Sequence, residues 1–119
     1  MAFAIGVMVT LLASVALLAG GGPGFRTRHL LEEHYAKHGY QFGKITQDQY
    51  LHMAQQLRDA RPGKNILEAK RPGGSTKFDK RNGWFVAYDS DGTIRTFFVP
   101  NEGIRYFARQ AKNYAGPPE

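Results

Sequence analysis

The hydrophobic pattern separates an apolar leader from a mixed domain. Residues 2–20 carry no charged side chain, whereas all 16 Lys and Arg and all 10 Asp and Glu residues follow Gly24. An uncharged run of this length is sufficient to span a bilayer as a helix. We therefore divide the chain into an apolar leader helix with a glycine-rich linker (1–24), a domain (25–115) and a loose tail (116–119).

The leader has three interpretations. No basic residue precedes the apolar run, as one would in a secretory signal, and the first cations are Arg26 and Arg28 behind it. This order favours a membrane anchor through residues 2–20 with the domain on the cytoplasmic side. The alternatives are a poorly formed export signal and the apolar end of a region belonging to a longer parent protein.

Helical periodicity marks the first part of the domain. Residues 26–37 predict a helix that Gly39 ends, and its apolar face carries Leu30, Leu31, His34 and Tyr35. A second helix is expected to begin at Thr46, which has capping-box spacing to Gln49, and to end at Pro62. Its apolar stripe is Tyr50, Met53, Ala54 and Leu57.

Beyond the second predicted helix, the period of the hydrophobic pattern shortens to two residues, which is typical of β-strands. Strands are expected at residues 65–70, 75–79, 84–89 and 93–99, with turn signals at Asn82-Gly83 and Asp91-Gly92. Residues 104–112 predict a short C-terminal helix. The sequence therefore predicts an α+β fold, with two N-terminal helices packed on a small antiparallel β-meander and a short helix at the end.

Strand alternation assigns the residues of the last strand to two faces. Ile94, Thr96 and Phe98 are expected on one face, and Thr93, Arg95 and Phe97 on the other. Thr96 would then lie among apolar neighbours, where a hydroxyl needs a partner or lines a cleft. An ordinary strand threonine is the alternative, and Arg95 is expected to be an outer-surface charge.

Composition narrows the classes of function. The formal charge of +6 resides entirely in the residues that follow Gly24, and such a surface attracts polyanions, chiefly nucleic acid or anionic lipid. The chain has no cysteine, which excludes disulfides and thiolate metal sites. A length of 119 residues leaves room for one modest core.

The segment from His34 to His38 is the strongest candidate for chemistry. The two imidazoles have the spacing of a metal-ligand pair, but Tyr35 stands where a zinc protease needs Glu, and Lys37 would repel a cation. No metal or other cofactor is expected. Acid–base catalysis on RNA fits better, with His38 in proton transfer and Lys37 beside the phosphate. His34 falls on the apolar face, so we assign it a supporting role.

Further residues complete the expected site. The basic residues Lys80 and Arg71 are candidates to line a groove that binds an anion. The alternative is that these charges are only exposed to solvent. Tyr106 is expected in the core, at a place where it can also stack on a base.

Several short motifs together resemble the C-terminal ribonuclease cassettes of bacterial polymorphic toxins, a group that includes barnase, EndoU, colicin D and RelE. They are His-Tyr-x-Lys-His-Gly-x-x-Phe-Gly, Thr-x-x-x-Tyr-Leu-x-x-Ala, a Gly-Gly/Phe-Asp hairpin and Gly-Thr-Ile-Arg-Thr-Phe-Phe, and they extend over residues 33–107. The resemblance implies a catalytic pair at Lys37 and His38, and a late-strand hydroxyl and aromatic at Thr96 and Phe98. It also implies metal-free cleavage of tRNA and neutralisation by an acidic immunity protein.

This chain departs from that pattern in three ways. The hydroxyl belongs to a threonine, Phe98 replaces a larger aromatic residue, and the segment 100–105 is short. The shortened segment implies either altered specificity or a decayed enzyme.

These observations lead to one main hypothesis and two alternatives. The main hypothesis is a monomeric, metal-independent endoribonuclease toxin domain, anchored in or exported from a bacterium, that cleaves tRNA or other structured RNA in the cytoplasm of a target cell. The first alternative is a membrane-anchored basic module that binds RNA or anionic lipid without catalysis. The second is an inert, membrane-tethered structural protein.

Overall fold

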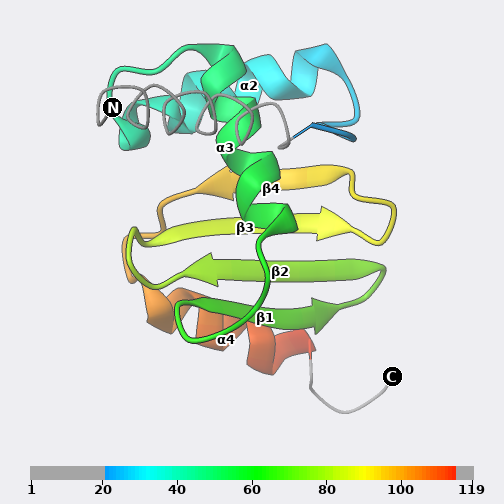
Figure 1. The fold of residues 1–119 in the computed structure, drawn as a ribbon, viewed down its shortest axis with the longest axis vertical. Helices are drawn as coiled ribbons and strands as arrows, with labels where there is room; N and C mark the ends of the chain where they lie inside the picture. The colour runs from blue at the N-terminus through cyan, green and yellow to red at the C-terminus, as the bar shows by residue number, and fades with distance from the viewer. Residues whose placement is uncertain (1–20, 115–119) are drawn as a thin grey trace, which may run out of the picture.

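A four-stranded antiparallel sheet separates two groups of helices in the computed structural model, which describes residues 21–114 (Figure 1). The strands β1 (Ile66–Arg71), β2 (Gly74–Asp79), β3 (Trp84–Asp89) and β4 (Ile94–Phe98) lie side by side in chain order. They follow α2 (Arg28–His38), the 3₁₀ helix η1 (Gly39–Phe42) and α3 (Gln47–Asp59), and they precede α4 (Ile104–Tyr114). The predicted α+β fold is confirmed, and each boundary lies close to the expected one.

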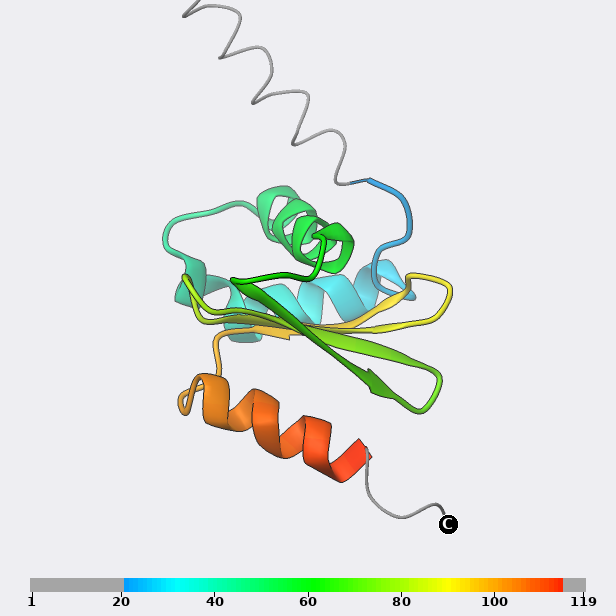
Figure 2. The same ribbon diagram turned by 60° about the horizontal axis from the view of Figure 1, so that its bottom comes forward.

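The three α-helices occupy different sides of the sheet. Helix α3 crosses one face, α4 lies on the opposite face, and α2 runs beside β4 (Figures 1 and 2). The predicted leader helix and the tail at 116–119 lie outside the described residues. Between residues 21 and 114, no helix is long and apolar enough to cross a bilayer.

Each face of the sheet has its own hydrophobic core. The larger core lies under α2 and α3 and contains Leu31, Tyr50, Ala54, Leu57, Val86, Ile94 and Phe97. The smaller core lies under α4 and contains Phe78, Phe85, Ala87 and Phe107. Tyr50 is fully buried, and its hydroxyl donates a hydrogen bond of 2.5 Å to the Phe97 carbonyl. This bond satisfies the buried hydroxyl and fastens α3 to β4.

The helix boundaries follow the capping residues. The Thr27 side chain accepts a hydrogen bond from the Leu30 amide, so α2 begins after Thr27. The capping box predicted at Thr46 and Gln49 is present in full.

Gly39 ends α2, as expected, but not through a left-handed residue. Its φ is −56°, and the chain continues directly into η1. A side chain at this position would meet the ring of Tyr35, because a Cβ atom on Gly39 would lie 2.7 Å from it. The left-handed residue comes later, at Gly43, where φ is +89°.

A β-bulge changes the faces predicted for β4. Ile94 pairs with Tyr88 and Thr96 pairs with Ala87, so Arg95 is an extra residue between the two pairs. Ile94 therefore lies in the larger core, whereas Thr96 faces the side of α4. The prediction that Ile94 shares a face with Thr96 and Phe98 is wrong, because alternation cannot anticipate an inserted residue.

The same bulge overturns the placement of Arg95 with Phe97. Phe97 is buried in the larger core. Arg95 remains exposed at the edge of the sheet, and its guanidinium lies 3.5 Å from the Asp89 carboxylate.

Buried cations fasten two other segments to the sheet. The Lys77 ammonium donates hydrogen bonds to the carbonyls of Arg58 and Ala60, at the C-terminal end of α3, where a positive charge is favourable. The Arg58 guanidinium donates to the carbonyls of Gly21, Pro23 and Gly92. Residues 21–23, which the sequence assigns to the linker, are therefore held against α3.

Candidate functional site

Five aromatic rings from four segments form a continuous row along the β4 edge. Ring centroids are separated by 4.9 Å between Phe25 and His34, 6.1 Å between His34 and His38, 5.2 Å between His38 and Phe98, and 5.4 Å between Phe98 and Tyr106. We call these five residues the aromatic row. It brings together four residues that the sequence nominated separately: His34, His38, Phe98 and Tyr106.

The end of α2 positions His38 in this row. His34 and His38 are one helical turn apart, so both imidazoles lie on the side of α2 that faces β4. Just beyond, the Gln41 side chain accepts a hydrogen bond of 3.0 Å from the Val99 amide and donates one of 3.1 Å to the Val99 carbonyl. These two bonds hold η1 against the end of β4, and His38 directly precedes η1 in the chain.

The surroundings of His38 favour its neutral form. Partial burial lowers its pKa below the usual 6.5, and the neighbouring His34 and Lys37 lower it further, while Gln41 opposes this. A neutral imidazole at pH 7 has a free lone pair and can accept a proton. His38 is therefore suited to be a general base.

The pKa of His34, like that of His38, is lowered below its usual value, and His34 is the more buried of the two. Burial lowers the pKa of His34 most strongly, Lys37 adds to the effect, and Glu33 opposes it. Its Nδ1 atom is buried without a hydrogen-bond partner in residues 21–114. Its ring lies between Phe25 and His38, and its supporting role stays a prediction.

A pocket of about 450 Å³ adjoins the far side of Phe98. Its walls are Phe98, Pro100, Asn101, Glu102 and Tyr106. Burial raises the pKa of Tyr106, so its hydroxyl keeps its proton, and the Arg109 guanidinium lies 5.8 Å from the ring centroid. The two aromatic residues that the sequence nominated for binding thus line one cavity next to His38.

Thr96 and Lys37 are close in the chain to members of the aromatic row. Thr96 is half-buried two residues before Phe98 on the same face of β4, and its hydroxyl has no hydrogen bond to residues 21–114. Lys37 is exposed and adjoins His38 in the chain. Lys37 is thus open to solvent, and Thr96 is partly so.

The two remaining candidates lie at opposite ends of the sheet. Arg71 pairs with the first residue of β2 and is bound to Asp89 at 2.7 Å. Lys80 follows the last residue of β2 and lines a separate pocket with Arg81 and Ile104. A six-residue strand is about 17 Å long, so the structure does not bring Arg71 and Lys80 together in one site.

A charged cluster that the sequence did not predict lies at the end of the sheet where β3 turns into β4. The carboxylate of Asp89 lies within 4 Å of three guanidiniums, at 2.7 Å from Arg71, 3.5 Å from Arg95 and 3.7 Å from Arg26. A second pocket, of about 290 Å³, adjoins this cluster and is lined by Phe25, Arg26, Leu30, His34, Ile94 and Arg95. These residues are far apart in the chain, and no local pattern signals their meeting.

Metal-ligating side chains do not gather in the described part of the chain. Between residues 21 and 114, no three His, Asp or Glu side chains lie together as a metal site. His34 and His38 have the i, i+4 spacing of a metal-ligand pair, and Lys37 lies between them in the chain.

Comparison with known proteins does not identify a family. No family model matches the chain, and none of the proteins with curated functions is significantly similar to it.

Proposed function

We propose that this domain is a metal-independent endoribonuclease in which His38 removes a proton from a ribose 2′-hydroxyl. The observation that carries the proposal is the position of His38. Partial burial lowers the pKa of its imidazole, the ring lies against Phe98 at 5.2 Å, and Phe98 in turn lines a pocket together with Tyr106. General bases require both a suitable pKa and an accessible position.

The reaction would transfer a phosphoryl group within the RNA strand. His38 accepts the 2′-hydroxyl proton, and the 2′-oxygen forms a bond to the adjacent phosphorus. The bond from phosphorus to the 5′-oxygen breaks, and that oxygen takes a proton from solvent. The products are a 2′,3′-cyclic phosphate and a 5′-hydroxyl, and no oxidant or cofactor is consumed.

The neighbouring residues would bind and orient the substrate. Lys37 supplies positive charge next to the phosphate, which gains negative charge at its oxygens during the reaction. The Thr96 hydroxyl donates a hydrogen bond to the same group. Phe98 and Tyr106 present aromatic surfaces on which the flanking bases stack, a contact that RNA-binding proteins use widely.

The resemblance to toxin cassettes extends the proposal to the biological setting. It favours tRNA as the substrate, a small acidic immunity protein as the partner, and a target cell's cytoplasm as the site of action. The apolar residues 2–20 favour membrane anchoring or export from a bacterium.

The test is incubation of the full-length chain, in a mild non-ionic detergent, with total tRNA in the presence of EDTA. We expect cleavage that yields 2′,3′-cyclic phosphate ends and that falls by at least about a hundredfold in His38→Ala. His52→Ala, a half-exposed histidine on α3, is the matched control and should cleave normally. Absence of cleavage, or equal cleavage by His38→Ala, would refute the proposal.

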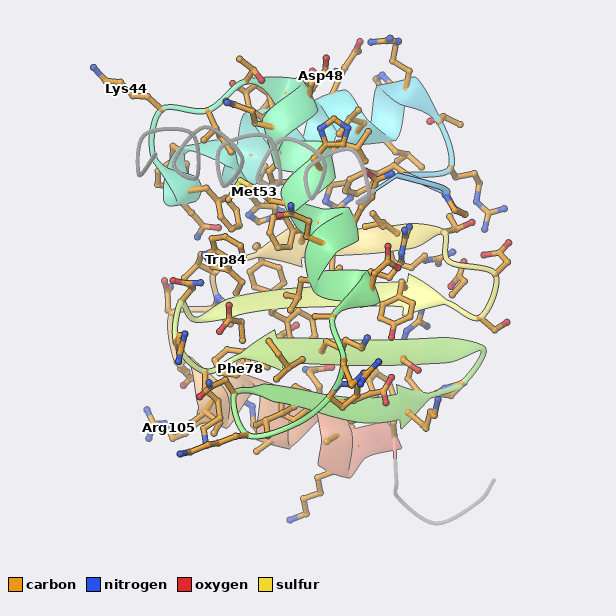
Figure 3. All side chains as sticks on the ribbon, in the orientation of Figure 1. Lys44, Asp48, Met53, Phe78, Trp84 and Arg105 are labelled. Atoms are coloured by element: carbon orange, nitrogen blue, oxygen red, sulfur yellow. The ribbon has the colours of Figure 1, made fainter. Side chains whose placement is uncertain are left out.

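The alternative is a basic module that binds RNA or anionic lipid without cleaving it. The observation in its favour is the basic side of α4, where Arg105, Arg109 and Lys112 line one shallow pocket (Figure 3 labels Arg105). This alternative predicts salt-sensitive binding that depends on total charge and is indifferent to His38→Ala.

A further inference from the structure

We propose that the pocket between α2 and the β4 bulge binds the RNA phosphate next to the one that is cleaved. The proposed ligand is a backbone phosphate with its nucleoside, held by Arg26 and Arg95. This inference rests on RNA being the substrate, and it adds a binding subsite that lies one helical turn from His38.

The charges around Asp89 leave two guanidiniums available for an anion. Arg71 makes the shortest contact with Asp89, and its side chain is only 15 % exposed, so its role is structural. The contacts of Arg26 and Arg95 with Asp89 are longer, at 3.7 and 3.5 Å, and these side chains are 64 % and 52 % exposed. A guanidinium carries five N–H donors, so each retains donors for an oxyanion.

The charges that gather around Asp89 have a positive balance. Three guanidiniums surround the single carboxylate of Asp89. Asp91, in the β3–β4 turn, is close enough to Arg26 to feel its charge and supplies a second negative charge. The cluster therefore keeps a net charge of about +1, which attracts a phosphate.

The pocket itself matches a nucleotide in chemistry. Its apolar floor consists of Phe25, Leu30 and Ile94, and its charged walls are Arg26 and Arg95. The Phe25 ring offers a stacking surface beside the guanidiniums, and His34 closes the end that faces His38. Single-stranded nucleic acid is commonly bound by such a combination of aromatic rings and cations.

The bulge in β4 gives this arrangement its geometry. The extra residue places the Arg95 guanidinium near Asp89 and turns Ile94 to the face opposite Thr96 and Phe98. The phosphate subsite and the proposed catalytic group thus lie along one edge of the sheet. Bulges are frequent next to active sites because they redirect a side chain in this way.

The test is the salt dependence of RNA binding by the full-length chain in non-ionic detergent. The probe is a fluorescein-labelled single-stranded RNA with 2′-O-methyl groups, which cannot be cleaved through the 2′-oxygen, and binding is followed by fluorescence anisotropy. The double variant Arg26→Gln/Arg95→Gln should reduce the slope of log K against log salt by about 1.4, since each phosphate contact in a single strand contributes about 0.7. Arg105→Gln/Lys112→Gln removes the same charge from exposed positions of α4 and should leave the slope unchanged.

The outcomes separate this inference from the proposed function. An unchanged slope in Arg26→Gln/Arg95→Gln, or an equal decrease in the α4 control, would overturn the phosphate subsite even if His38-dependent cleavage is observed. The expected decrease together with no cleavage of tRNA would support the subsite while refuting the nuclease. Thermal unfolding monitored by circular dichroism should be similar for all variants, because Arg71 retains the closest contact with Asp89.

Discussion

The imidazole of His38 lies against the phenyl ring of Phe98, with 5.2 Å between the centroids and 30° between the planes. This contact joins the end of α2 to the end of β4, two segments that are separated by α3 and three strands in the sequence. It partly withdraws the imidazole from water and so lowers its pKa.

The charge of Lys37 is expected to influence both histidines. Lys37 lowers the pKa of His34 and of His38, so Lys37→Gln should raise both values toward 6.5. NMR titration of the imidazole resonances measures this directly. Lys44→Gln, an exposed lysine that extends away from the body of the molecule in Figure 3, is the control and should leave both unchanged.

Stability is expected to fall as the pH is lowered from 7.5 to 5. The pKa values of His34 and His38 are lower in the folded state than the usual 6.5, so below that pH the unfolded chain binds more protons than the folded chain. The free energy of unfolding then decreases with decreasing pH. Urea denaturation at several pH values tests this, and His34→Gln should weaken the dependence. A stability that rises toward pH 5 would contradict the direction of both shifts.

The hydroxyl of Thr96 is expected to serve the reaction and not the fold. Its side chain has no hydrogen bond to residues 21–114, so Thr96→Val should leave the melting temperature nearly unchanged. Loss of one hydrogen bond to a charged phosphoryl group costs about 1.5–3 kcal/mol, which corresponds to a tenfold to hundredfold slower cleavage. Thr96→Ser retains the hydroxyl and should restore most of the rate. Equal rates for valine and threonine would remove Thr96 from the site.

Gly39 is expected to tolerate no side chain. A Cβ atom there would lie 2.7 Å from the Tyr35 ring, which cannot move freely because its hydroxyl donates a 2.6 Å hydrogen bond to the Ile45 carbonyl. Gly39→Ala should therefore destabilise the protein by about 1–3 kcal/mol. Gly63→Ala, where no atom lies within 4 Å of the added Cβ, should change stability by no more than about 0.5 kcal/mol. Urea denaturation of the two variants measures the difference.

Arg58 is expected to hold the segment that joins the leader to the domain. Its guanidinium donates to the carbonyls of Gly21 and Pro23, and Arg58→Leu removes both bonds, leaving the Pro23 carbonyl with the Gln55 amide as its donor. Limited chymotrypsin digestion should then cut after Phe25 faster than in the unchanged protein. Arg61→Leu, an exposed arginine just beyond α3, is the control. Equal cleavage rates in both variants would show that the segment is held by other contacts.

The candidate site could be predicted in part because some of its chemistry is local. The neighbours Lys37 and His38, the single turn between His34 and His38, and the nearness of Thr96 to Phe98 are all properties of one helix or one strand. Arg71 and Lys80 were grouped with them by charge alone, and the structure places these two at opposite ends of β2. The cluster of Arg26, Arg71 and Arg95 around Asp89 could not be predicted, since its members meet only through the register of the sheet.

The sequence by itself determined the order and type of the elements in residues 21–114, because periodicity, capping residues and turn signals act over a few neighbouring residues. The tertiary structure decided which faces meet. The bulge at Arg95 shifts Ile94 away from the face of Thr96 and Phe98, and the docking of Gln41 on Val99 brings His38 to that same face. Both effects depend on hydrogen bonds between segments far apart in the chain, and local patterns carry no information about such pairings.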